Sequence, residues 1–501
     1  MMKKSIIVVF CLLTIVANAQ KKPTKIKLQN ADVFEYIERD GEKTKRLIGN
    51  VSFKHENVLM SCDSAFLYSK SNTLDAYGNV KVNKEDGLKI VGDFLKYKGD
   101  SKLANIKGNV ILTHDDILLS TTSMNHDITN NIATYTNWGE IIDKENVLTS
   151  RIGIYYADNK DFFFKDKVTL KNPKYNMTAD TLRYNTDSEK AFFLGPTTIT
   201  SDENTIYCEN GWYDTKQNLS QFNKHAKIFS NSQSISGDSL FYDRDKGYGK
   251  AISNVEIWDT IQNLIIRGDF AEYFEKKDEA VVSENVLLIN IYEDDSLFLH
   301  ADTLRSGFDT TGEHKILLAY NKVRFYKPDL QGKCDSMVFF YQDSTIHLFS
   351  GPIIWSEQNQ MTADFISLKW GDGSIESLSF ENNSFIVSEV DSNKYNQIKG
   401  KNMLGSFLDN ELRKIKVTGN GETVYFVQEE DSSFVGVNKA ICSDMMIYVE
   451  ENNIKKITFI KQPASTLYPI DELSNQELEL KGFIWFPEKR PLSKADIFIW
   501  K

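Results

Sequence analysis

A column of aspartates, each directly after a small residue, is the feature of this 501-residue sequence that could carry chemistry. Its members are Asp63, Asp93, Asp180, Asp238, Asp269, Asp302, Asp335, Asp364 and Asp444. Repeated carboxylates could bind calcium or act as paired glycosidase carboxylates. A glycosidase, however, needs two carboxylates singled out in one cleft, and calcium-binding β-rolls repeat glycine-rich nonapeptides, which this chain lacks. We therefore interpret the column as architecture and predict no metal, no cofactor and no catalytic residue.

The residues around each aspartate indicate a bend in a strand. Three positions before the aspartate stands Met, Ile or Leu, with Gly332 breaking the column, and two positions after it the residue is again apolar. Side chains alternate along a strand, so both sets can face one core only if the alternation changes phase between them. This requires a β-bulge or corner, where the small residue allows close approach and the carboxylate can accept a freed backbone N–H.

The bend belongs to a repeat. Gly-Asn-Val opens a unit at Gly49, Gly78 and Gly108, and about thirteen units of roughly thirty residues reach Phe459. Strand runs are short and rich in β-formers, they alternate with polar turns, and no segment shows a sustained apolar period of 3.6. Such a pattern is typical of a stacked array, so we expect an all-β solenoid forming one elongated body over residues 20–459.

The two ends of the chain do not follow the repeat. Residues 1–19 carry a basic start, a short apolar run and an Ala-Asn-Ala cleavage site, which predict a signal peptide and an exported protein. The tail, residues 460–501, is punctuated by prolines and ends in an apolar run. It is either a capping element that covers the last exposed edge or a docking strand for a partner.

Composition excludes several classes of function. The net charge of −11 argues against a nucleic-acid partner, because phosphates require a basic face. Nucleophile-elbow, phosphate-loop, dinucleotide-binding and zinc-protease motifs are absent, and the seven histidines are scattered. We therefore predict that the protein is not an enzyme. The four cysteines after the signal peptide show no metal-ligand spacing and are interpreted as small buried residues.

The apolar residues that the units direct inward are the candidate binding surface. The candidates are Phe53, Phe66, Ile90, Phe94, Leu95, Leu182, Ile235, Leu240, Ile266, Phe270, Leu304, Ile366 and Met446. In a closed solenoid these side chains fill a core, whereas between two diverging walls they would line an open trough suited to acyl chains. Periodicity alone does not distinguish these two arrangements.

The openers and the runs at 58–65 and 88–97 resemble the OstA-like family, which includes LptA, LptC and the periplasmic part of LptD. The tail run at 480–491 is similar to that of long OstA-like proteins of Bacteroidetes. The resemblance covers about residues 25–459. It implies a twisted β-jellyroll, V-shaped in section, whose interior shields the acyl chains of lipopolysaccharide. It also implies end-to-end strand addition to LptC-like and LptD-like partners.

These observations lead to one principal hypothesis and two others. The principal hypothesis is a periplasmic lipopolysaccharide-transport protein that moves lipopolysaccharide to the outer membrane. Whether the protein is itself associated with that membrane is left open by the sequence. The alternative is a structural or adhesive β-solenoid with a dry core that binds protein or glycan on its outer surface. A carbohydrate-active solenoid enzyme is the third hypothesis.

Overall fold

The computed structural model describes residues 24–39, 41–202, 204–292, 295–371, 374–408, 411–429, 433–450 and 453–500. Within these ranges it contains 36 β-strands and three short 3-10 helices, so the predicted all-β class is confirmed. No helix of this part of the chain combines the length and the apolar character that crossing a bilayer requires. The predicted signal peptide at 1–19 lies outside the described residues.

The chain divides into two compact units, each described here by itself. Unit 1 comprises the chain up to Pro173 together with Asp180–Asp187. Its strands are β1 (Lys27–Asn30), β2 (Val33–Arg39), β3 (Glu42–His55), β4 (Val58–Tyr68), β5 (Thr73–Lys84), β6 (Lys89–Lys98), β7 (Leu103–His114), β8 (Ile117–Asp127), β9 (Ile132–Tyr135), β10 (Gly139–Asp143), β11 (Asn146–Ser150), β12 (Ile152–Tyr156) and β13 (Asp161–Asn172). Strand β14 (Tyr175–Asn185) contributes residues to both units.

Unit 2 comprises Lys174–Ala179 and Ser188–Lys501. Its first strands are β15 (Lys190–Thr200), β16 (Thr205–Asp214), β17 (Leu219–Phe229), β18 (Gln233–Asp243), β19 (Tyr248–Asp259), β20 (Leu264–Phe274), β21 (Glu279–Ile291) and β22 (Ser296–Phe308), with η1 at Glu275–Lys277. The later strands are β23 (Lys315–Tyr320), β24 (Val323–Lys327), β25 (Leu330–Cys334), β26 (Ser336–Phe340), β27 (Thr345–Phe349), β28 (Ile353–Ser356), β29 (Asn359–Thr362), β30 (Phe365–Gly371), β31 (Ser374–Asp391), β32 (Lys394–Leu408), β33 (Glu411–Gln428), β34 (Phe434–Glu450), β35 (Asn453–Ile460) and β36 (Ala464–Tyr468). The single array over 20–459 stays a prediction.

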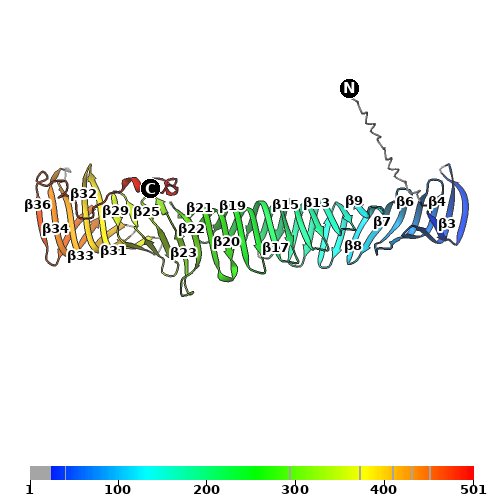
Figure 1. Cartoon of the computed structure of the whole chain (residues 1–501), viewed down its shortest axis with the longest axis horizontal. Coiled ribbons are helices and arrows are strands. Elements are labelled where there is room, and N and C mark those ends of the chain that lie inside the picture. Colours follow the sequence, from blue (N-terminus) through cyan, green and yellow to red (C-terminus); the bar gives the residue numbers. More distant parts are fainter. Residues whose placement is uncertain are drawn as a thin grey trace, which may run out of the picture. The chain divides into compact units, whose positions relative to one another are not determined.

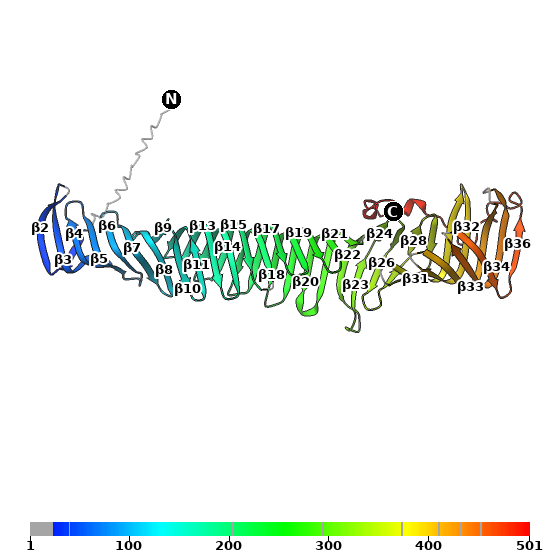
Figure 2. The same cartoon turned by 180° about the vertical axis from the view of Figure 1, so that it is seen from behind.

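Neighbouring strands in each unit pair antiparallel, in chain order where the strands are long (Figures 1 and 2). The pairing shifts register in the middle of each long strand, at the small-Asp step and at the Gly-Asn opener. In β5 and β6, for example, Gly78 and Asn79 together stand opposite Asp93. Two residues against one is the arrangement of a β-bulge. Elsewhere, as at β23 and β24, the corner separates two short strands.

The bulge changes which residues face inward, as the sequence pattern requires. In β4 the buried side chains before the corner are Met60 and Cys62, and after it they are Ala65 and Leu67. Because the buried positions are three apart across the corner and two apart elsewhere, one face of the bent strand contacts the core along its whole length. Asp63, at the bend, is exposed.

The core of unit 1 is tightly closed. One row of cross-strand neighbours on its inward face is no more than 4% exposed at any position. The row consists of Phe53, Met60, Val82, Ile90, Leu112, Leu119, Ile141, Leu148 and Leu170. Buried polar pairs complete this interior, such as His55 Nδ1 with the Tyr97 hydroxyl at 2.6 Å. Unit 1 therefore has the filled core expected of a closed solenoid.

The chain after β36 packs on its own unit. Strand β36 still pairs with β34, so the repeat extends beyond the predicted start of the tail at residue 460. Residues 469–500, called the tail from here on, contain only η2 (Pro487–Lys489) and η3 (Asp496–Phe498). They run back along unit 2 over β32, β29 and β25 (Figure 1). The tail therefore lies on the face of the sheet, and neither predicted alternative describes this arrangement.

Candidate functional site

The aspartate column is held by a second column that sequence reasoning did not connect to it. The side-chain amide of Asn79, from the opener of β5, donates to Asp63 Oδ2 at 2.8 Å. The same bond joins Asn109 to Asp93 at 2.8 Å and Asn254 to Asp238 at 2.9 Å. At these three aspartates, and at Asp269 and Asp364, the donor is thus an asparagine side chain, whereas the sequence predicted a backbone N–H. Other members of the column are bonded differently: the hydroxyls of Thr181 and Ser336 donate to Asp180 and Asp335, and Lys322 donates to Asp302. Asp444 alone of the nine is shown with a backbone donor, the Gly419 N–H at 3.1 Å.

The opener glycine makes room for this bond. Gly78 has a φ of +73°, and a Cβ at this position would collide with the Asp63 carboxylate. Gly-Asn and small-Asp are therefore two halves of one corner, contributed by neighbouring strands. The same geometry at Gly49, Asn50 and Asp32 shows that Ala31-Asp32 is a further copy that the sequence analysis missed. Among the described residues, no group of three or more His, Cys, Asp or Glu side chains is placed to hold a metal ion.

Seven of the thirteen groove candidates are buried in the core. They are Phe53, Ile90, Leu95, Leu182, Leu240, Leu304 and Ile366, each at most 4% exposed. Two others, Ile235 and Ile266, face inward but are partly exposed to solvent. The structure therefore brings nine candidates to the inward side of their units.

The other four candidates lie on the outward face, and for these the groove prediction is wrong. Phe66 alternates with buried Ala65 and Leu67, and the same alternation turns Phe94, Phe270 and Met446 outward. Both Phe66 and Phe94 pack against Tyr77. The centroid of the Tyr77 ring lies 6.1 Å from that of Phe66 and 5.0 Å from that of Phe94. The sequence analysis selected Phe66, Phe94 and Phe270 for their apolar type, whereas the phase change at the bulge decides their direction. Met446 stands two positions after Asp444, where an inward side chain was predicted, but in this repeat Met445 is the buried residue.

Unit 2 contains the inward surface that solvent reaches. Six isoleucines on consecutive strands β15 to β20 are direct cross-strand partners of one another, and all six are partly exposed. This isoleucine row consists of Ile199, Ile206, Ile228, Ile235, Ile257 and Ile266. The next inward partners, Leu288 and Leu299, are 6% and 2% exposed. The row therefore forms a continuous apolar track that opens to solvent over β15 to β20 and closes toward β22.

The residues adjacent to the row are polar or point to the other face. Ser234 and Ser236 flank Ile235, and Ile265 lies on the opposite face from Ile266. Ile265 and Ile266 are both partly exposed, yet they belong to different faces of one strand. This pair provides a matched internal comparison for any ligand that uses the inward face.

The four cysteines of the described chain are buried and free, as the sequence predicted. Burial raises the pKa of the Cys62 and Cys208 thiols to about 11 and that of Cys334 to about 12. A thiol with such a pKa is protonated at neutral pH, and the thiolate is the nucleophile. These groups are therefore packing residues.

A search of curated proteins finds no match to this chain. Residues 23–180 match the sequence profile of a family described as OstA-like protein. The match covers the openers and bends of β3 to β8, whose corner geometry is described above. OstA-like proteins form a transport and binding family, and the match begins just before β1 and ends within β14. The resemblance seen in the sequence is thereby confirmed over residues 23–180, which match the OstA-like family.

Proposed function

We propose that the protein is a non-enzymatic carrier that binds lipopolysaccharide in the periplasm and moves it to the outer membrane. The isoleucine row carries the proposal, because it is an apolar track that crosses six strands and is accessible to solvent. Burial of each methylene group contributes about 0.8 kcal/mol, so an acyl chain laid along such a track gains binding energy without any single dominant contact. The OstA-like match and the predicted signal peptide support the same function.

Partner proteins of the LptC-like and LptD-like kind would join at the ends of the array. Strand β2 pairs with β3 and carries exposed apolar side chains, namely Val33, Phe34 and Tyr36 at 45%, 43% and 72% exposed. Strand β36 pairs with β34 and is largely exposed. Strand addition at such edges supplies main-chain hydrogen bonds to a partner of the same fold.

The first test is a charge placed in the track. Ile235→Asp and Ile266→Asp should reduce the lipopolysaccharide that copurifies with the full chain, because a carboxylate against acyl chains must be desolvated. Ile265→Asp, on the opposite face, is the control and should leave the copurified lipid unchanged. Equal lipid recovery from all three variants would contradict the transport proposal.

The alternative function uses the outer face. Phe229 and Trp258 lie on the face opposite the isoleucine row and are 45% and 46% exposed. A structural or adhesive protein that binds protein or glycan would use such side chains and would keep its interior dry. If Trp258→Ser abolished binding of a protein or glycan while Ile235→Asp left that binding intact, the result would favour this alternative.

A further inference from the structure

The turns between the long strands lie along two edges of the array, because each strand passes through its corner on the way from one turn to the next. Successive turns on one edge are bonded to each other: the Glu85 N–H donates to the Asn57 carbonyl on one edge, and the Ile128 N–H donates to the Lys102 carbonyl on the other. We call the line along which the two edges face each other the mouth. In unit 1, side chains bond across the mouth and hold the edges together.

Two buried hydrogen bonds cross the mouth of unit 1 in the same way. His55, the last residue of β3, bonds through Nδ1 to the Tyr97 hydroxyl at 2.6 Å. His114, the last residue of β7, bonds through Nδ1 to the Tyr155 hydroxyl at the same distance. Both tyrosines are 1% exposed. The residues joined lie 42 and 41 positions apart, so the contact recurs with the repeat.

An outer layer of ion pairs covers these bonds. Lys102 pairs with Glu56, and Lys160 pairs with Asp115 at 3.1 Å, so each acid directly follows one of the two histidines. These four side chains are between 30% and 61% exposed. Exposed ion pairs are individually weak, so the buried bonds contribute more to the closure. We call each histidine–tyrosine bond with its ion pair a latch.

On one edge of unit 2, the position of the latch histidine is occupied by serine. His55 stands two positions after Phe53 of the buried row in unit 1, and Ser201 and Ser230 stand two positions after isoleucines of the isoleucine row. The hydroxyls of Ser201 and Ser230 donate to backbone carbonyls of their own turns, at 3.2 and 3.0 Å. A serine side chain is much shorter than that of histidine, and these two bond within one edge.

The other edge of unit 2 keeps the tyrosine. Tyr97 stands four positions after its column aspartate, and so do Tyr242 and Tyr273. The Tyr242 hydroxyl donates to Glu275 Oε2 at 2.6 Å, in the next turn of the same edge. Tyr273 is 41% exposed. The mouth beside the isoleucine row is therefore lined by short hydroxyl side chains on one edge and by partly exposed tyrosines on the other.

Beyond the isoleucine row an aromatic pair spans the mouth. Tyr292 directly follows β21 on one edge, and Trp370 lies near the end of β30 on the other. Their rings stack with centroids 5.9 Å apart. This contact agrees with the burial of Leu288 and Leu299, the inward residues that follow the row. The opening therefore coincides with the strands on which the isoleucines are exposed.

We infer that an amphiphile enters and leaves unit 2 sideways through this mouth, with its hydrocarbon part on the isoleucine row and its polar part at the mouth hydroxyls, and that the latches close unit 1 to it. The inference rests on the proposed function, because it takes the isoleucine row as the binding surface. Serine and tyrosine hydroxyls can donate to and accept from the ester, amide or sugar oxygens of such a molecule. Sideways entry also spares the polar part a costly passage through the apolar interior.

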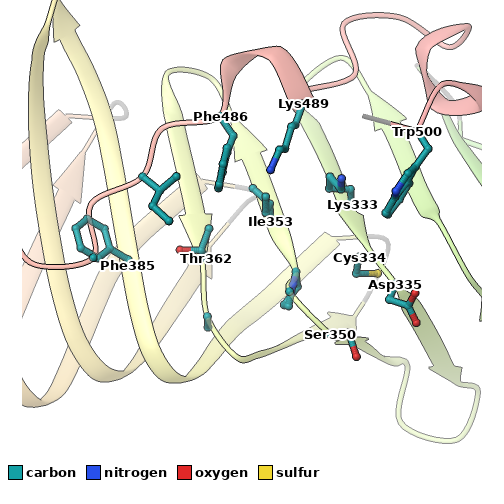
Figure 3. A pocket seen from close by; sticks show the side chains of 15 residues that line it. Lys333, Cys334, Asp335, Ser350, Ile353, Thr362, Phe385, Phe486, Lys489 and Trp500 are labelled. Carbon is teal, nitrogen blue, oxygen red and sulfur yellow. The ribbon is translucent and has the colours of Figure 1, made fainter.

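A second hollow of unit 2 is the competing site. It has a volume of about 520 Å³ and lies between the tail and the outer face of the sheet. Figure 3 shows Phe486 and Trp500 of the tail above it, with Ile353 on a strand below. An amphiphile bound there would contact the tail, so mapping the peptides that it touches distinguishes the two sites.

The test is photolabelling of the purified full chain with a hexadecanoic acid that carries a diazirine, followed by mass spectrometry of the peptides. The parent chain should carry at least tenfold more label on β15 to β20 than on β3 to β13. Opening the latches should raise the label on β3 to β13 at least fivefold. The latch variant combines Tyr97→Phe, Tyr155→Phe, Lys102→Ala and Lys160→Ala. The control variant makes the same kinds of change on the outward face: Tyr77→Phe, Tyr156→Phe, Lys107→Ala and Lys165→Ala.

A second variant tests the mouth of unit 2 without changing unit 1. Ser201→Trp places a large ring at the mouth and should lower the label on β15 to β20 at least fivefold. Thr200→Trp is its control, because Thr200 is exposed on the outward face beside Ser201. Thermal melting checks that every variant is folded, and Ser201→Trp keeps the inference testable if the latch variant unfolds.

Three results would overturn the inference and leave the transport function standing. Equal label on both units of the parent chain would show that the latches do not exclude an amphiphile. Equal label on β15 to β20 in Ser201→Trp and Thr200→Trp would show that entry does not use this mouth. No gain of label on unit 1 in a folded latch variant would show that the latches do not close it. Label confined to the tail and the strands beneath it would contradict both the inference and the transport function.

Discussion

Replacement of the opener glycine Gly78 by alanine tests the corner that a Gly-Asn opener forms with the small-Asp step of the neighbouring strand. The alanine must adopt a φ of +73°, which costs an L-residue about 1–2 kcal/mol. Its Cβ would also collide with the Asp63 carboxylate, which must move and give up its bond to Asn79, worth about 1 kcal/mol. Together the two effects predict a loss of about 2–3 kcal/mol in the local stability of β4 to β6.

Gly41→Ala is the matched control. Gly41 has the same φ of +73°, but a Cβ there would meet no atom within 4 Å. This variant should therefore show the backbone cost alone, about 1–2 kcal/mol. Hydrogen exchange of the full chain, followed by mass spectrometry of the peptides from each corner, gives both values, because exchange protection reports local opening.

A double-mutant cycle isolates the contact with the carboxylate. In the Asp63→Ala background the collision is absent, so Gly78→Ala should cost about 1 kcal/mol less than in the parent chain. The reasoning is refuted if Gly78→Ala costs no more than Gly41→Ala, or if the cost is the same with and without Asp63. Either result would mean that the glycine is required only for its backbone angle.

Three further predictions concern the tail, the pH dependence of unit 1 and the thiols. Gln360 makes two hydrogen bonds to the tail: its Nε2 donates to the Ile484 carbonyl at 2.7 Å, and its Oε1 accepts from the Phe486 N–H at 2.8 Å. Gln360→Ala removes both bonds, so trypsin should cleave the tail at least several-fold faster than in the parent chain. Gln358 is exposed, and Gln358→Ala should leave the cleavage rate unchanged. Burial lowers the pKa of His126 to about 4, below its unfolded value of about 6.5. The neutral ring is therefore favoured in the fold, and its contribution, up to about 3 kcal/mol, is complete above pH 6.5 and is lost as the pH falls toward 4. Urea midpoints of unit 1 should fall more steeply over this window in the parent than in His126→Phe, and parallel slopes would contradict this. A thiol reagent at pH 8 should modify less than one cysteine per folded chain, whereas in urea it should modify all four of the described cysteines. Rapid modification of the folded protein would contradict this prediction, because it would show that the buried thiols are accessible.

The repeat and its bends could be predicted because they depend on local alternation. Met60 and Ala65 lie on opposite phases of a strand, and only a bulge directs both to one core. Gly332 breaks the apolar column without leaving a gap in the core, because the Phe325 ring of its cross-strand partner fills the space where a side chain would lie. These relations are visible at short range in the sequence.

Other features depend on contacts between distant residues and could not be predicted. The bond from Asn79 to Asp63 joins the Gly-Asn opener of one strand to the small-Asp step of its neighbour, and neither motif alone indicates the other as its partner. The tail is held by buried glutamines, such as Gln397, whose amide pairs with the backbone of the tail at Leu478 and Leu480. The residues joined lie 81 and 83 positions apart, and no periodic signal marks them.

The measurement that tests the central claim most directly is site-specific photocrosslinking in cells at Ile266 and, separately, at Ile265. The two positions are adjacent in β20, are both partly exposed and face opposite sides of the sheet. The transport function predicts a lipopolysaccharide adduct at Ile266 and none at Ile265. Equal adducts at both positions, or adducts at Ile265 alone, would contradict a lipid track on the inward face of unit 2.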